Sequence, residues 1–311
     1  MIYNISMRRR TLAITLISLA LVVQAAAQPS IGIGNLKFFE RAYPDLTFTR
    51  KYDRKIEDWV ITVKVPDTPG NKNGPGKTGE FVWANGSMLP VQELDNKEKY
   101  WTLLYGYQKE LADPANVTEA QKERIKTFGS TENRQNGACT PMFFFDFLYD
   151  SATRENLENH IVRLNFLGNA TNVHERMREP LRRVEEKIYA LSDGGTQESQ
   201  EVRDFLANIR SNDAYYWRII AGTTRKSFHS LGIAVDILPK NQGGKQIFWG
   251  WAKDKFPDTW MLIPLKDRWM PPQSVIRIFE EEGFIWGGKW TIYDNMHFEY
   301  HPELIMYNFR K

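Results

Sequence analysis

Three ionisable side chains in apolar, strand-like segments are the residues of this sequence best suited to chemistry. His229 and Asp236 lie in the segment SFHSLGIAVD, and His297 lies in DNMHFE. Asp236 is in phase with the apolar residues of a strand pattern, where a buried carboxylate must be paired or bind a metal. Gly232 allows the sharp turn that would bring His229 beside this strand. Imidazole nitrogen and carboxylate oxygen are zinc ligands, so the three predict a catalytic Zn²⁺ site with an open fourth position.

Two acidic side chains accompany His297. Asp294 lies three residues before it, so a turn would place both in one pocket, with Asp294 beside a bound water rather than on the metal. Glu299 shares a strand face with His297 and is expected to accept a hydrogen bond from an imidazole. Taken singly, each residue has a simpler interpretation: His229 as a core histidine, Asp294 as a turn residue and Glu299 as a surface acid.

The pattern S-x-H-x-x-G-x-A-x-D, followed about sixty residues later by D-x-M-H-F-E, resembles the M15 peptidases. This family comprises D-alanyl-D-alanine carboxypeptidases and L-alanyl-D-glutamate endopeptidases. The likeness is greatest to the endolysin-like branch, subfamily C, in which an Asp rather than a Glu precedes the second histidine ligand. It extends from about Asn172 to Leu304 and includes Trp217-Arg218 and the segment FEEEGFIWGGKW.

The resemblance implies a role for each matched position. His229, Asp236 and His297 match the zinc ligands, and Asp294 matches the catalytic acid/base. Arg218 matches an arginine that contacts the substrate or stabilises the oxyanion, with Arg225 as its rival for that role. The remaining positions are expected to line the site or support its ligands, although core packing is an equal interpretation for the tryptophans: Ser227, Glu299, Trp286 and Trp290.

The implied activity is hydrolysis of peptidoglycan stem peptides by a zinc-activated water. The cut is either that of an L-Ala–D-Glu endopeptidase, which the branch favours, or that of a D-Ala–D-Ala carboxypeptidase. One alternative is a non-catalytic zinc-containing module that binds peptidoglycan or a protein. A second is a serine hydrolase using Ser227 and His229, although no G-x-S-x-G elbow accompanies them.

The first 27 residues have the pattern of a signal peptide. Three consecutive arginines precede an apolar run, Thr11–Val23, and the small residues Ala25–Ala27 follow. We therefore expect an exported protein, periplasmic or secreted, with no stable membrane insertion after cleavage; a retained anchor is the alternative. The chain has 41 basic and 38 acidic residues, and removing three arginines leaves 38 of each. This balance argues against a nucleic-acid partner, and the oligomeric state stays open.

The order of helical and strand-like patterns predicts an α+β fold, with a small antiparallel sheet carrying the zinc site. The resemblance implies a hedgehog/D,D-peptidase-like domain over residues 166–311, preceded by a mixed N-terminal region of unknown role over 28–165. Strands are expected at 58–65, 215–221, 233–238, 284–286 and 296–300, and helices at 97–111, 118–128, 172–191, 198–209 and after Pro271-Pro272. A loop is expected at 66–79 and a tight hairpin at Asn85-Gly86.

Three histidines and the single cysteine are assigned no chemistry. His160 and His174 are expected in polar, helical surroundings, and His301 is expected at the surface. Cys139 precedes the apolar segment MFFF and is interpreted as a small buried hydrophobe. As the only cysteine, it cannot form an intramolecular disulfide.

Overall fold

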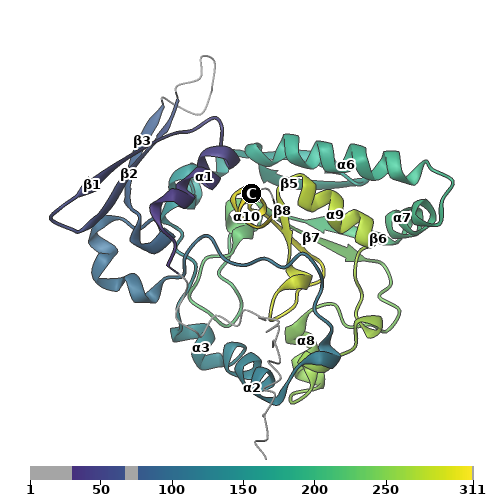
Figure 1. Cartoon of the computed structure of the whole chain (residues 1–311). Helices are drawn as coiled ribbons and strands as arrows, with labels where there is room; N and C mark the ends of the chain where they lie inside the picture. The colour runs from purple at the N-terminus through teal and green to yellow at the C-terminus, as the bar shows by residue number, and fades with distance from the viewer. Residues whose placement is uncertain (1–29, 67–75, 310–311) are drawn as a thin grey trace, which may run out of the picture.

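The computed structural model describes residues 30–66 and 76–309, which form an α+β structure with small antiparallel sheets and surrounding helices (Figure 1). The expected signal peptide, residues 1–27, lies outside the described residues. In the part of the chain that is described, no helix combines the length and the apolarity needed to cross a bilayer. Helix α1 (Leu36–Ala42) precedes the first sheet and packs against α10 (Pro302–Phe309) near the C-terminus.

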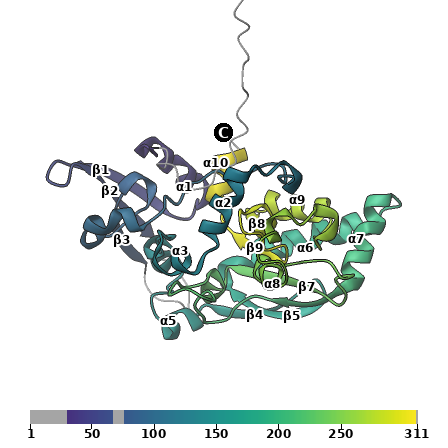
Figure 2. The same cartoon turned by 90° about the horizontal axis from the view of Figure 1, so that it is seen from below.

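The first sheet lies at one end of the molecule in both views (Figures 1 and 2). Its strands are β1 (Thr47–Asp53), β2 (Asp58–Val65) and β3 (Lys77–Val82), in that order. The β-branched run of β2 confirms the predicted strand. The loop prediction for 66–79 is wrong at its end, because β3 begins at Lys77; residues 67–75 are not described.

Two further predictions for this half of the chain fail because tertiary pairing decides the backbone. The chain does reverse around Asn85-Gly86, but only Val82 and Leu89 pair, so the tight hairpin is replaced by a longer loop. No α-helix covers 97–111: a 3₁₀ helix ends at Lys99, and the chain then pairs with the segment around Cys139. Backbone hydrogen bonds to Cys139 on both sides of Tyr100 fix this irregular path.

Four helices follow, of which the first was predicted. They are α2 (Glu119–Phe128), α3 (Thr131–Asn136), α4 (Phe143–Leu148) and α5 (Arg154–Glu158). Helix α2 begins after Thr118, whose hydroxyl accepts from the Gln121 N–H while the Gln121 side chain bonds back to the Thr118 N–H. This reciprocal cap explains why the sequence signal was reliable.

The next elements correct one helix boundary. A hairpin of β4 (Ile161–Phe166) and β5 (Asn169–His174) occupies the start of the predicted helix, so α6 spans only Arg178–Ser192. Pro180 lies in its first turn, where no intrahelical N–H donor is lost. Helix α7 (Gln197–Asn208) confirms the next prediction.

The central sheet positions the candidate site. Its strand order is β6–β7–β9–β8, with antiparallel neighbours. The strands are β6 (Ile209–Asp213), β7 (Ala234–Pro239), β8 (Phe284–Trp286) and β9 (His297–Tyr300). Strand β6 was not predicted. The predicted strand 215–221 is instead an exposed loop, because its backbone pairs locally with Arg225 and Lys226.

Helices surround the central sheet. Helix α9 (Gln273–Glu281) follows Pro272, as predicted, and the left-handed Gly283 ends the turn after it. Helices α6, α7 and α9 pack together, and the β4–β5 hairpin lies beside β6 (Figures 1 and 2). Helix α8 (Trp249–Lys255) lies with α2 and α3, away from α6 (Figure 1).

One large apolar core joins side chains from both halves of the chain. Phe39 and Phe144 belong to it together with Val235 and Phe298 from the central sheet. A smaller cluster under α8 joins Trp249 to Ile125 and others. The expected boundary at 165/166 falls inside β4, and the division into two domains stays a prediction.

Candidate metal centre

Neighbouring strands and a left-handed turn bring the three predicted ligands together. Asp236 on β7 pairs directly with His297, the first residue of β9. His229 lies in the short 3₁₀ helix Phe228–Leu231, which Gly232 ends with φ +68°. The ligand atoms of His229, Asp236 and His297 all lie within 4.8 Å of one another, so this triad could hold a metal ion.

Hydrogen bonds to the outer ring nitrogens fix how both imidazoles face the centre. His229 donates its Nδ1–H to the Ala214 carbonyl at 2.6 Å, and His297 donates its Nε2–H to Glu299 Oε1 at 2.9 Å. Their inner nitrogens, His229 Nε2 and His297 Nδ1, are 3.2 Å apart. They lie 3.2 and 2.7 Å from the two oxygens of Asp236.

This arrangement fits a divalent cation. With both outer nitrogens protonated, two imidazole lone pairs and a carboxylate converge, and three acceptors this close need a proton or a cation between them. Ligand atoms about 2.0–2.1 Å from a tetrahedral zinc ion are about 3.3 Å apart. The triad's ligand atoms are 2.7–3.2 Å apart, so they would have to move apart only slightly to hold the ion.

The pKa values of the triad reflect the same crowding. Burial raises the pKa of Asp236, but the adjacent His229 and His297 lower it more, so the net pKa lies well below its usual range. Burial lowers the pKa of His297, but Asp236 and Glu299 raise it well above its ordinary value. Without a metal, a proton on His297 therefore supplies the positive charge that the site requires.

A buried chain of hydrogen bonds continues from His297 into the N-terminal half. Glu299 accepts from His297 and, through its other oxygen, from His301 Nε2 at 3.3 Å. His301 Nδ1 donates to Glu303 at 2.8 Å, and the Tyr43 hydroxyl donates to the other oxygen of Glu303 at 2.7 Å. The surface prediction for His301 is wrong: it is 3 % exposed, and Glu303 is fully buried.

Acidic and basic groups alternate along this hydrogen-bonded chain, and each group shifts the pKa of its neighbours toward the charged form. Burial raises the pKa of Glu299, but hydrogen bonds from His297 and His301 bring it down to about 2. Burial lowers the pKa of His301, but Glu303 and Glu299 raise it to about 9. Glu299 is thus a buried, charged acceptor for a triad imidazole, as the sequence predicted, and not a surface acid.

Asp294 lies beside the triad with an unsatisfied oxygen. Its Oδ1 is buried and has no hydrogen-bond partner among the described residues, while the Met296 backbone bonds to the carboxylate. Gly287 allows close approach here, since a Cβ would lie 2.7 Å from the Asp294 carbonyl oxygen. Burial raises the pKa of Asp294, His297 lowers it and Asp236 raises it, with a net value of about 7. A cation in the triad would lower it again.

The triad and Asp294 border a cleft of about 1010 Å³. Arg218, Arg225 and Ser227 also line it, with Arg218 on the exposed loop that replaces the predicted strand. Trp290 lines the cleft with its ring 5.3 Å from that of His297. Trp286 does not: it is fully buried in the core, where its indole N–H donates to the Asn295 carbonyl.

Ser227 supports the turn that carries His229. Its hydroxyl accepts from the His229 backbone N–H at 3.3 Å, as an N-cap. The ring nitrogens of His229 contact Ala214, Asp236 and His297. Because no hydrogen bond joins the Ser227 hydroxyl to the His229 ring among the described contacts, the geometry gives no support to a serine nucleophile.

Further lining of the cleft comes from the N-terminal region and from α8, and it was not predicted. Trp101 and residues of α2 and α3, including Arg134, contribute from the N-terminal region, and residues of α8 contribute from the C-terminal region. No local sequence motif marked these positions, because each meets the triad only through the tertiary fold.

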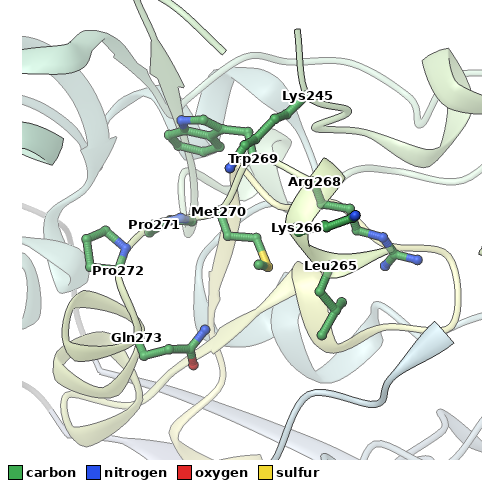
Figure 3. Close-up of a pocket in the computed structure, with 9 residues that line it drawn as sticks. All are labelled: Lys245, Leu265, Lys266, Arg268, Trp269, Met270, Pro271, Pro272 and Gln273. Carbon is green, nitrogen blue, oxygen red and sulfur yellow. The ribbon is translucent and has the colours of Figure 1, made fainter. Parts of the chain in front are cut away.

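Figure 3 shows a second pocket, of about 360 Å³. No triad residue lines it, although it shares Arg268 with the cleft. Its wall contains cationic side chains, apolar side chains and one amide, but no carboxylate or imidazole: Lys245, Leu265, Lys266, Arg268, Trp269, Met270, Pro271, Pro272 and Gln273. It therefore offers no comparable set of metal ligands.

His160 and His174 also differ from their predicted surroundings. Both are buried, and their rings stack with centroids 5.4 Å apart where β5 ends. His174 receives a hydrogen bond from the Arg176 N–H at its Nδ1 and donates from Nε2 to the Tyr149 carbonyl. Only the neutral ring can make both bonds, so His174 has a structural role.

Comparisons with known proteins agree with this location of the site. Residues 221–300 match the sequence profile of an M15 peptidase family described as D-alanyl-D-alanine carboxypeptidase. That segment contains the triad and Asp294. It is shorter than the stretch from about Asn172 to Leu304 over which the sequence resembles the M15 peptidases, and it excludes Arg218. Residues 35–104 match a family described as a domain of unknown function. No curated protein and no solved structure gives a significant match.

The match supports placement of this segment in the M15 peptidase family, without resolving a branch. Together with the triad, it indicates a hydrolase domain of a type that acts on peptidoglycan. M15 peptidases typically use zinc, and the His-Asp-His set is suited to that ion.

Proposed function

We propose that this protein is an exported zinc metallopeptidase that hydrolyses the stem peptides of peptidoglycan. The observation that carries the proposal is the convergence of two imidazole lone pairs and one carboxylate at the border of a large cleft. The family match over the same residues supports a peptidase. The N-terminal sequence pattern supports export, and we further propose a hedgehog/D,D-peptidase type of fold.

Zinc, when bound by the triad, would polarise the scissile carbonyl and lower the pKa of a water molecule toward about 7. Asp294 has the free carboxylate oxygen and the position to accept a proton and return it to the leaving amine. Glu299 holds His297 in the tautomer that presents Nδ1 to the centre. Arg218, on the cleft rim, supplies positive charge for the developing oxyanion.

The bond cleaved is the finer part of the proposal. Asp294 in the D-x-M-H-F-E motif matches the endolysin-like branch, which favours the L-Ala–D-Glu endopeptidase cut over removal of terminal D-Ala. A cleft of about 1010 Å³ has room for several residues of a peptide and supports an internal cut.

The test is to measure zinc content of the purified protein together with release of new amines from purified peptidoglycan, with and without a chelator. The proposal predicts about one zinc per chain and cleavage that the chelator abolishes, with mass spectrometry of the fragments identifying the bond. Bound zinc without cleavage of any stem peptide would replace the enzyme by a zinc-containing binding module. Chelator-resistant cleavage would exclude the role given to zinc.

A further inference from the structure

Two arginines from different halves of the chain line the cleft near each other, and neither has a carboxylate partner among the described residues. Arg134 comes from α3 and Arg225 from the loop that precedes His229, and both line the same cleft as the triad. Neither forms an ion pair within the described residues. Their charges are therefore not neutralised by the protein in that part of the chain.

Backbone carbonyls hold both guanidinium groups in fixed positions. Arg134 Nη2 donates to the Ala221 carbonyl at 2.7 Å, so α3 is tied to the loop that carries Arg225. Arg225 Nη2 donates in return to the carbonyls of Asn133 and Gly137, at 3.2 and 2.5 Å. Each group also lies over an indole ring, Arg134 over Trp249 at 5.0 Å and Arg225 over Trp101 at 5.8 Å.

These contacts use one nitrogen of each guanidinium group. An arginine has five N–H donors, and the described contacts leave the Nε and Nη1 donors of both residues available. The two cations are also close enough to repel one another: burial lowers the pKa of Arg134, and Arg225 lowers it further. A bound anion would relieve this repulsion and take up the remaining donors.

We propose that Arg134 and Arg225 form a subsite that binds a free carboxylate of the peptide substrate. The inference rests on the proposed function and specifies its substrate class: an acidic peptide with a free carboxylate beyond the scissile bond. A planar carboxylate matches the paired donors of a guanidinium group. The subsite also assigns a role to α3 of the N-terminal region, because its Arg134 would hold the substrate in the cleft that the triad borders.

The experiment uses pairs of stem peptides that differ only in whether one carboxylate is free or amidated, with each carboxylate tested in turn. Steady-state kcat and KM are measured for the wild type, Arg134→Gln, Arg225→Gln and Arg134→Lys. Arg210→Gln serves as a matched control, because Arg210 is exposed on β6 and outside the cleft. Circular dichroism and thermal unfolding verify that each variant is folded.

The proposal predicts that the wild type prefers one free-acid peptide over its amide, mainly through KM. A charge-assisted hydrogen bond typically changes binding by roughly 10- to 100-fold. Arg134→Gln and Arg225→Gln should each remove most of this preference, Arg134→Lys should restore part of it, and Arg210→Gln should leave it unchanged. Equal loss on the acid and the amide, or no preference in the wild type for any carboxylate, would overturn the proposal.

Binding measurements separate this inference from the proposed function. Isothermal titration of the same peptide pairs into zinc-loaded Asp294→Asn protein, with and without Arg134→Gln, needs no turnover. If the wild type cleaves neither peptide, the peptidase assignment fails, yet an acid-over-amide preference that Arg134→Gln abolishes would still establish the carboxylate subsite. Cleavage of both peptides without such a preference would retain the peptidase and reject the subsite.

Discussion

Glu299 accepts a hydrogen bond from His297 through one oxygen and from His301 through the other, at 2.9 and 3.3 Å. Its carboxylate is therefore shared between a triad imidazole and a buried histidine outside the triad. The first bond fixes the His297 tautomer, and the second fixes the carboxylate. Such partners of ligating histidines make the imidazole more basic and orient its ring.

Glu299→Gln should weaken zinc binding by roughly 10- to 100-fold, since a neutral amide is a poorer acceptor for the His297 N–H. Competition with a chromophoric chelator measures this affinity. Glu282→Gln is the matched control, because Glu282 pairs with Arg183 and Lys187 away from the cleft. Equal zinc affinity in the wild type and Glu299→Gln would refute the role of Glu299.

Substitutions in the triad and at Asp294 should separate metal binding from turnover. His229→Ala and Asp236→Asn should lose zinc and activity together, because each removes a ligand or its charge. Asp294→Asn should retain about one zinc per chain while its kcat falls by roughly 10²–10⁴, the usual contribution of an acid/base group. Metal analysis and peptide hydrolysis on the same samples test both statements; an active Asp294→Asn enzyme would contradict the role of Asp294.

His174 should make the fold less stable in mild acid. Burial lowers its pKa, as do His160 and the cations Arg176 and Lys77, with a net value of about 3 against 6.5 in the unfolded chain. The unfolded chain then binds one proton more than the folded chain between these values. This contribution to stability is fully present above pH 6.5. Below pH 6.5, the equilibrium constant for folding falls about tenfold for each pH unit.

Urea unfolding at pH 7.5, 6.0, 5.0 and 4.5 measures this effect. Comparison with His174→Gln isolates it from the other titrating groups. The variant should be less stable at pH 7.5, because Gln cannot replace both ring hydrogen bonds, but its stability should fall less steeply with acid. Parallel pH profiles for the two proteins would show that His174 does not titrate as described.

Gly232→Ala should destabilise the fold and the site together. Gly232 has φ +68°, and a Cβ there would lie 2.6 Å from the His174 backbone nitrogen. The left-handed conformation alone costs a non-glycine residue about 1–2 kcal/mol. Gly168→Ala is the control for the cost of the left-handed conformation alone, because Gly168 has φ +79° and no atom within contact distance of a Cβ. A larger loss of unfolding free energy in Gly232→Ala than in Gly168→Ala would confirm the contact; equal losses would exclude it.

The triad could be predicted because local patterns indicated the setting of its residues and the resemblance to the M15 peptidases distinguished them from simpler interpretations. A β-branched run set β7, a glycine marked the turn after His229, and a short apolar strand carried His297. The direct pairing of Asp236 with His297 was not readable, because strand register depends on the whole sheet.

The remaining features depend on contacts between distant segments. Residues 97–111 have helical periodicity, yet their backbone pairs with the Cys139 segment instead. His301 follows a strand and precedes a proline, which is typical of a surface position, but Glu303 and Tyr43 enclose it. Arg134 lies on a short polar helix, and nothing in its local sequence relates it to a cleft.

The hydrogen bond from Tyr43 to Glu303 has a consequence for how such proteins can diversify. Glu303, a fully buried carboxylate, takes one of its partners from Tyr43 at the end of α1, 260 positions earlier in the chain. Recombination that exchanged the first half for an unrelated module would leave that acid without its hydroxyl and the cleft without one wall. A functional exchange of the first half alone would therefore have to supply both a new partner for Glu303 and a new wall for the cleft.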